Sequence, residues 1–170
     1  MGLDSTLFRY SLVNEEVDGG AESDFDSVSF GAGIPNAGLN FGGTVLNGLV
    51  LGGRVNVGRY GQDQLLEDYS LVIWSVLPYL EYVFLDGVFR PFVTVIAGVE
   101  GVADYLNDDT WWWGFNVSGG GGFHFFVHQH ISIDFSLLAG FVIGSGERNN
   151  QDFQHRRFTM SCLFGVSGWF

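Results

Sequence analysis

Apolar and polar residues alternate along almost the whole chain with a period of two. In the closing stretch from Phe158 to Phe170, one set of alternate residues is mostly apolar and the other is mostly small or polar. Residues two apart on a β-strand share a face, whereas an amphipathic helix places apolar residues three or four apart. Because the sequence shows no segment with the helical spacing, the pattern predicts an all-β protein.

Residues typical of turns divide the alternating sequence into eight predicted strands. They are Thr6 to Val13, Ser27 to Leu46, Leu49 to Tyr60, Tyr69 to Phe84, Val88 to Tyr105, Trp111 to Val127, Ile131 to Gly146, and Gln154 to Phe170. The second strand changes phase between Ile34 and Leu39, which predicts a bulge near Pro35 and Asn36. Eight is the smallest number of strands that closes a common membrane barrel. We therefore expect residues 1–170 to form one domain, an eight-stranded antiparallel up-and-down β-barrel.

Short and long connections alternate between these strands. The short ones are Asn47-Gly48, the stretch around Asp86-Gly87, and His128-Gln129-His130, of which the first two have residue types favoured in tight hairpins. The other four are longer and acidic, and read NEEVDGGAESDFD, GQDQLLED, NDDT and GERNNQDF. Because successive strands reverse direction, we expect short turns at one end of the barrel and acidic loops at the other.

The composition indicates which face of the strands is outside. Charged residues make up 15% of the chain, whereas about 25% is usual, and aromatic residues make up 16%. The more polar face is too small and too poor in charge for a solvated exterior, and the bulky apolar face would overfill a narrow lumen. Aromatic residues also gather near the strand ends, as in interfacial girdles, and the terminal Trp169 and Phe170 would be the last interfacial anchor. The sequence thus predicts a transmembrane barrel, with a soluble barrel around an apolar core as the alternative.

Six charged residues occupy positions that face the lumen in this interpretation. They are Arg9, Arg54, Arg90, Glu81, Glu100 and Asp134. Buried charges persist only when they are paired and hydrogen-bonded. We therefore expect these residues to form an ion network that plugs the lumen.

The balance of charge restricts the possible partners. The net charge is −12, with 19 acidic residues against 7 basic ones. This charge argues against nucleic acid, whose phosphates require a basic surface. The acidic loops could bind Ca²⁺ or contact lipopolysaccharide through bridging divalent ions, although their spacing matches no calcium-binding loop. Cys162 has no second cysteine to pair with, so no internal disulfide is possible.

The chain resembles the small eight-stranded outer-membrane barrel proteins of the OmpA-like and OmpX-like kind. The similar features are the terminal Phe170, the alternate apolar residues before it, the short turns and the long polar loops. The stretches SVLPYLEYVFLDGVFRPFVTVIAGVEG and GGGGFHFF also resemble uncharacterised outer-membrane barrel proteins of Gram-negative bacteria. The resemblance implies an integral outer-membrane protein with periplasmic termini and extracellular acidic loops.

The same resemblance suggests partners and an assembly signal. It implies that Phe164, Val166 and Phe170 belong to the signal recognised by the barrel-assembly machinery. Outer-membrane lipids and lipopolysaccharide are the other expected partners, and we expect a monomer. The resemblance implies topology and location but no activity.

Few residues suggest chemistry. His124, His128 and His130 have alternate spacing that could bind zinc or nickel, but no cysteine or nearby carboxylate completes such a site, and we predict no metal or cofactor. His155 with loop acids could serve an enzyme that modifies lipid A, yet no serine lies at a telling position. We therefore predict a non-enzymatic protein with a structural or surface-interaction role, with a small pore and a lipid A-modifying enzyme as alternatives.

Overall fold

The computed structural model describes the backbone of residues 2–17, 21–30, 38–64, 67–84, 86–104, 110–148 and 151–169. It describes side chains over 39–57, 72–84, 86–103, 111–147 and 151–169. Within these ranges the elements are β1 Gly2–Val17, β2 Ala21–Phe30, β3 Gly38–Leu46, β4 Leu49–Gln64, β5 Glu67–Val83, β6 Phe89–Asp104, β7 Thr110–His128, β8 Ile131–Arg148 and β9 Gln151–Gly168. The described part of the chain has no helix long and apolar enough to cross a membrane.

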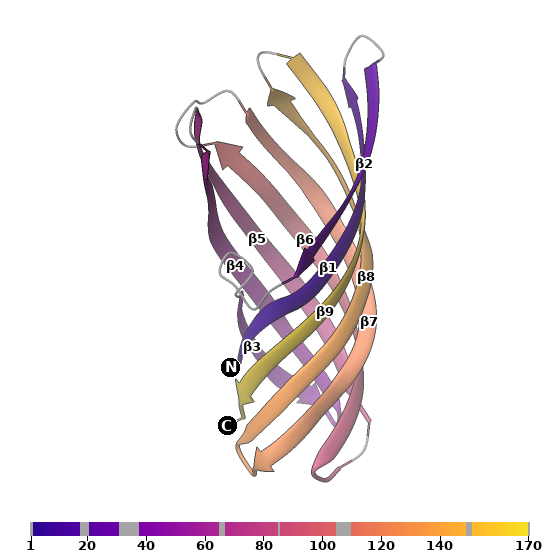
Figure 1. Cartoon of the computed structure of the whole chain (residues 1–170). Coiled ribbons are helices and arrows are strands. Elements are labelled where there is room, and N and C mark those ends of the chain that lie inside the picture. The colour runs from indigo at the N-terminus through magenta and orange to yellow at the C-terminus, as the bar shows by residue number, and fades with distance from the viewer. Residues whose placement is uncertain are drawn as a thin grey trace.

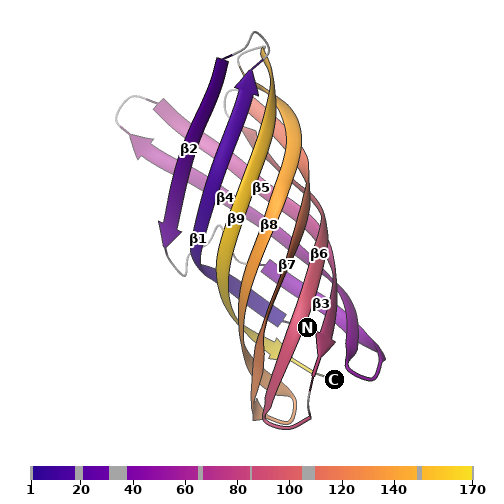
Figure 2. The same ribbon diagram turned by 90° about the vertical axis from the view of Figure 1, so that its right-hand side faces the viewer.

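The strands pair with their neighbours around a barrel. From β3 to β9 each strand is antiparallel to the next, and β1 pairs with β9 along one edge. The other edge of β1 pairs with β2 over most of its length and with β3 at its start, where Gly2–Asp4 meets 38–40 (Figures 1 and 2). The segments β2 and β3 therefore share one position around the barrel, which has eight positions. This arrangement confirms the predicted fold class, an antiparallel up-and-down β-barrel.

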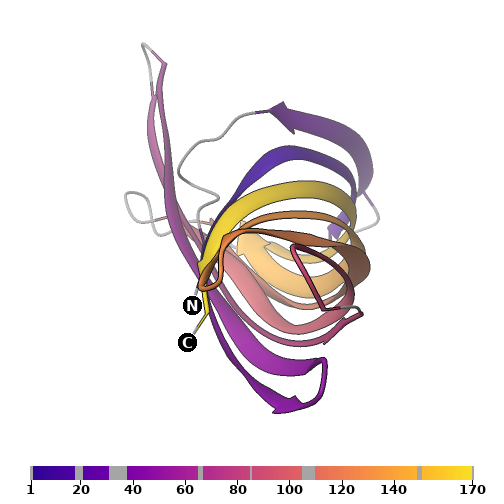
Figure 3. The ribbon, with the colours of Figure 1, turned by 90° about the horizontal axis from the view of Figure 1, so that it is seen from below.

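Toward the loop end, the described strands pair incompletely beside β2. Above β3, the described residues include no pairing that joins β2 directly to β4, whereas each strand from β4 to β9 pairs with the next and β9 pairs with β1. Seen from the turn end, the strands curve around a common interior, and β4 and β5 extend to one side, away from β2 (Figure 3). The predicted bulge at Pro35 and Asn36 lies outside the described residues.

The three predicted short connections lie at one end, together with both chain ends (Figure 1). Gly48 and Gly87 have φ angles of 76° and 129°, which glycine adopts at low cost because it has no Cβ. Hydrogen bonds also hold this end together, among them that from the Val83 amide to the Gly48 carbonyl at 2.6 Å. The tight-turn prediction is therefore confirmed for Asn47-Gly48, which joins β3 directly to β4, whereas the connection from β5 to β6 is longer, between Val83 and Phe89.

At the opposite end the strands extend further than predicted. The ladder between β1 and β2 continues to Val17 and Ala21, so most of the acidic stretch from Asn14 to Asp26 is strand. The β4–β5 ladder likewise reaches Gln64 and Glu67. Acidity marked these segments as loops in the sequence, but backbone pairing depends little on side-chain charge at an exposed strand end.

The two faces of the strands differ as the alternation predicts. Trp112 is 8% exposed and faces the lumen, whereas its neighbours Trp111 and Trp113 are 43% and 51% exposed and face outward. Other large apolar side chains are exposed on the outside, including Leu51, Val76, Leu80, Val93, Val95, Phe115, Val117, Leu137, Phe141, Ile143, Met160, Phe164 and Val166. The barrel is therefore apolar outside.

Glycines make room for large side chains inside the barrel. A Cβ on Gly52 would lie 2.4 Å from Cζ of Tyr79, the residue opposite it on β5. A Cβ on Gly122 would lie 1.9 Å from the carbonyl oxygen of Phe135. These distances are shorter than any ordinary contact, so the inward glycines are required by the close approach of strands and rings.

Candidate functional site

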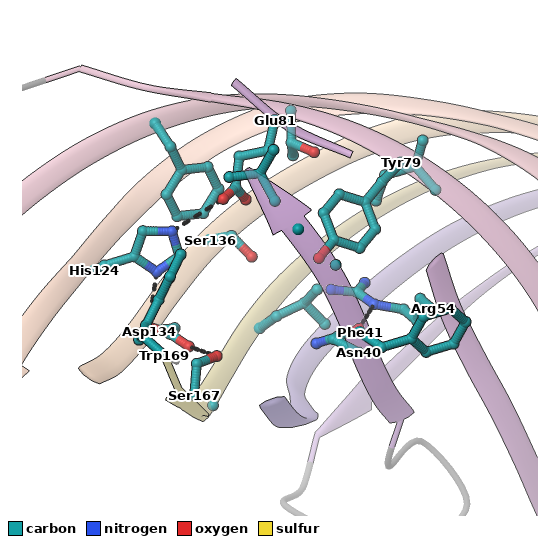
Figure 4. A pocket seen from close by; sticks show the side chains of 18 of the residues that line it. Asn40, Phe41, Arg54, Tyr79, Glu81, His124, Asp134, Ser136, Ser167 and Trp169 are labelled. Carbon is teal, nitrogen blue, oxygen red and sulfur yellow. Dashed lines mark hydrogen bonds and ion pairs between the residues drawn. The ribbon is translucent and has the colours of Figure 1, made fainter. Parts of the chain in front are cut away.

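The turn end of the lumen holds an imidazole between two carboxylates. His124 of β7 contacts Oδ1 of Asp134 through Nδ1 at 2.7 Å and Oε1 of Glu81 through Nε2 at 3.1 Å (Figure 4). Asp134 lies directly opposite His124 on β8, and Glu81 comes from β5. Ionised carboxylates only accept hydrogen bonds, so with Asp134 and Glu81 both ionised the two ring nitrogens of His124 both donate. His124 thus joins three strands through charge-assisted hydrogen bonds.

Asp134 extends this network to the end of β9. Its Oδ1 accepts from the Ser132 hydroxyl at 2.6 Å, and its Oδ2 accepts from the Ser167 hydroxyl. Ser132 in turn accepts from the indole Nε1 of Trp169 at 2.9 Å. The sequence suggested that Trp169 is an interfacial anchor, but its ring points into the lumen. Trp169 lies two residues after the inward Ser167 and therefore faces the same way.

Aromatic rings cover this network. Phe92 stacks on His124 with ring centroids 4.5 Å apart, and Trp169 meets the same imidazole edge-on at 5.0 Å. Phe126 packs against Trp169, and the Arg90 guanidinium lies 4.1 Å from the centre of the Phe126 ring. Together these side chains pack against one another at the turn end of the lumen. We call them the lower plug.

A cavity of about 200 Å³ lies next to the lower plug. Its lining is partly charged, and Figure 4 shows Arg54 and Tyr79 on one side of the pocket, with His124 and Asp134 on the other. The Arg54 Nε donates to Oδ1 of Asn40 on β3 at 2.8 Å. The cavity is therefore polar on several sides.

A second network lies toward the loop end. Arg157 of β9 forms an ion pair with Glu100 of β6, and Nδ2 of Asn116 donates to the other Glu100 oxygen at 2.7 Å. Trp112 lies beside this ion pair, with the centre of its ring 5.4 Å from the Arg157 guanidinium. The His155 ring stacks on the Trp112 ring, with ring centroids 4.3 Å apart. This end also has an apolar cluster of Trp112, Val142, Phe153 and Val102. We call this cluster with the ion pair the upper plug.

Two cavities that share part of their lining lie beside the two networks. A second cavity of about 130 Å³ lies beside the Glu100 ion pair. It shares four lining residues with the larger cavity, namely Arg54, Ile96, Leu138 and Leu163. Ile96 and Leu163 are buried. These four residues lie where the two cavities adjoin, and we call them the central ring.

The predicted lumen residues occupy different places in this arrangement. Glu81 and Asp134 share His124, Glu100 pairs with Arg157, and Arg54 lies in the central ring. Arg90 belongs to the lower plug and makes no ion pair within the described part of the chain, while its Nε donates to the Gly87 carbonyl. The side chain of Arg9 lies outside the described residues.

Sequence reasoning missed the two cations that meet the predicted acids, His124 and Arg157. Both occupy inward-facing positions in the alternating pattern of their strands, so the pattern already predicted that they face the lumen. The register, which decides which inward residues share a height, could not be read from the sequence.

The remaining predicted residues are at the turn end. Phe164 and Val166 face outward and are 43% and 50% exposed, while Phe170 lies outside the described residues. The rings of His128 and His130 are 6.0 Å apart, and Nδ1 of His130 contacts the Trp169 carbonyl at 2.8 Å. In the described residues no group of three or more His, Cys, Asp and Glu is arranged to hold a metal ion.

Known proteins match this chain in structure. The outer membrane protein OprG from Pseudomonas aeruginosa superposes with a TM-score of 0.58 at 11% identity, covering 99% of this chain and 96% of that one. Neisserial surface protein A, NspA, superposes with a TM-score of 0.53 at 13% identity, covering 98% and 96%. No protein-family model matches the chain, and neither does any curated protein. The predicted resemblance to small outer-membrane barrel proteins is therefore confirmed for the fold.

Proposed function

We propose that this protein is an integral outer-membrane β-barrel with a closed lumen, which acts as a structural or surface-interaction protein rather than as an open pore. The observation that carries the proposal is the inverted distribution of side chains. Leu137, Phe141 and Ile143 of β8 are 56%, 62% and 65% exposed, whereas the inward Val142 is 1% exposed. A barrel with this outside surface is stable in lipid, where apolar side chains need no water.

The fold supports the membrane location. The solved structures it matches include an outer membrane protein and a surface protein of Gram-negative bacteria. In this setting the short turns and both termini would face the periplasm, and the opposite strand ends would face the exterior. Lipids and lipopolysaccharide would surround a monomeric barrel, and outward Phe164 and Val166, with Phe170, would be read by the barrel-assembly machinery.

The closed lumen is supported by three successive obstructions. The lower plug, the central ring and the upper plug each combine rings or branched side chains with a charged group. An ion that crossed the barrel would have to displace buried, paired charges at both ends, which is costly. A structural role with a plugged lumen therefore fits better than free permeation.

Two measurements test the proposal. The purified protein should migrate faster on detergent gels before boiling than after it, because a folded barrel resists the detergent. In planar bilayers the folded protein should show no stable single-channel conductance. High solubility in plain buffer would contradict the membrane barrel, and steady conductance would contradict the closed lumen.

A small pore is the second candidate, since two cavities already lie inside the barrel. Replacing Ile96, Leu138 and Leu163 by alanine should join the cavities and weaken the central barrier. A matched triple variant on the outer face uses Val95, Leu137 and Met160, which are all exposed. Conductance gained only by the central-ring variant would support the closed wild-type lumen. Equal conductance in the wild-type protein would favour the pore.

The enzyme alternative receives less support from the position of His155. This side chain is 4% exposed and stacks on Trp112 inside the barrel. A residue that attacks or deprotonates lipid A must reach the lipid surface, which the His155 ring does not face. We propose a non-enzymatic role.

A further inference from the structure

One arginine faces away from the lumen. Among the arginines whose side chains the structure describes, Arg54 and Arg157 line the inner cavities and Arg90 belongs to the lower plug. Arg156 is exposed and faces outward from β9, whereas the adjacent Arg157 faces inward. Among the described side chains, an outward-facing arginine on an otherwise apolar surface requires an explanation.

Arg156 has no acidic partner within the described part of the chain. Its Nη2 donates only to Oε1 of Gln154 at 3.4 Å, which is a long hydrogen bond. Gln154 is the next outward residue on the same strand and is also exposed. The guanidinium therefore has most of its five donors available to an external group.

The surroundings of Arg156 indicate its depth in the membrane. In register, it lies opposite Ile143 of β8, which is 65% exposed, and Gln154 lies opposite Ser145. Ser145 is in turn opposite the exposed Trp113 of β7. Tryptophan concentrates at the level of lipid headgroups, so Arg156 lies near the boundary between the apolar band and the loop end.

The apolar band begins on the other side of Arg156. The next outward residue of β9 is Phe158, whose ring lies 4.9 Å from that of Phe141. Toward the loop end the strand instead carries the exposed acid Asp152. An outward charge is expensive at the bilayer midplane but costs little at the interface, where an anionic headgroup is available.

We infer that Arg156, with Gln154, binds a phosphate group of a phosphorylated glycolipid of the lipid A type in the outer leaflet. This inference rests on the proposed membrane location. A guanidinium binds phosphate with paired hydrogen bonds, and the Gln154 amide adds a donor beside it. The chain carries a net charge of −12, so general attraction cannot bring anions to the barrel and the contact depends on this local cation.

Native mass spectrometry of the detergent-solubilised protein tests the site. The probe is bisphosphorylated lipid A, and the comparison is the same lipid after enzymatic removal of both phosphates. The wild-type protein should retain the phosphorylated lipid preferentially. Arg156→Gln should lower its apparent affinity about tenfold, equivalent to the loss of roughly 1.4 kcal/mol, and should leave the dephosphorylated lipid unaffected.

Two variants control for charge and position. Arg156→Lys keeps the charge and should retain part of the affinity, because a lysine binds phosphate without the planar pair of donors. Arg90→Gln removes a cation at the turn end and should leave lipid A binding unchanged. An equal loss in both Gln variants would overturn the assignment, since it would reflect total charge.

The outcomes separate this inference from the function on which it rests. If Arg156→Gln shows the heat-modifiable migration of a folded barrel but binds lipid A as the wild type does, the phosphate site is wrong and the membrane barrel stands. If the wild-type protein prefers the dephosphorylated lipid or shows no preference, the site is also wrong. If the wild type fails to fold in detergent or lipid, the proposed function itself fails.

Discussion

The ion pair between Glu100 and Arg157 gives the sharpest test of how the lumen is held together. Their side chains are 13% and 18% exposed, so neither charge can be well hydrated if its partner is removed. Breaking a buried pair by neutralising one member typically costs about 3–5 kcal/mol, whereas replacing both members can be nearly neutral. We expect Glu100→Gln and Arg157→Met each to cost about 3 kcal/mol.

A double-mutant cycle separates the pair from other effects. Because the double variant leaves no buried charge uncompensated, we expect it to cost less than either single change, so that the coupling free energy exceeds about 3 kcal/mol. The assay is urea unfolding of the barrel folded into lipid vesicles, followed by tryptophan fluorescence and by gel migration. Arg156→Met is the matched control, since it removes the adjacent outward arginine, and should change the unfolding free energy by about 0.5 kcal/mol or less. Additive costs of the two single variants would refute the reasoning.

Three further results are expected at other positions. Trp169→Phe removes the indole donor to Ser132 and should cost about 1 kcal/mol in the same unfolding assay; a fully neutral effect would argue against the inward ring. Gly122→Ala should destabilise the barrel by about 2–3 kcal/mol, because its Cβ would meet the Phe135 carbonyl; normal stability would contradict this close approach. His155→Ala should leave the acylation pattern of lipid A unchanged in cells that express the protein, as measured by mass spectrometry; an altered pattern dependent on His155 would revive the enzyme interpretation.

Much of the fold follows from one property of the sequence, its period of two. That period places Trp112 inside the barrel and Trp113 outside, as their exposures of 8% and 51% show. Turn chemistry located Gly48 and Gly87, because a tight reversal with positive φ selects glycine. These features are local, so they can be read from a few neighbouring residues.

The contacts within the site could not be predicted from local sequence patterns. The alternation placed Glu81 and Asp134 inside the barrel but could not assign His124 as their common partner, because that contact depends on the register of three strands. Similarly, the aromatic character of Trp169 suggested an interfacial anchor, while its parity with Ser167 pointed inward. Parity decided the outcome, because a neighbouring side chain on a strand must point the opposite way.

The seam between β1 and β9 sets the order in which the barrel can form. From β3 to β9 each ladder joins strands that follow one another in the sequence, so these hairpins can form one after another with short loops to close. The seam instead joins residues as far apart as Gly2 and Ser167. Bringing two distant segments together lowers the entropy of the chain before any stabilising contact forms, so this step is slow. Substitutions along the seam should therefore change the rate of barrel closure more than equally destabilising substitutions in a central hairpin.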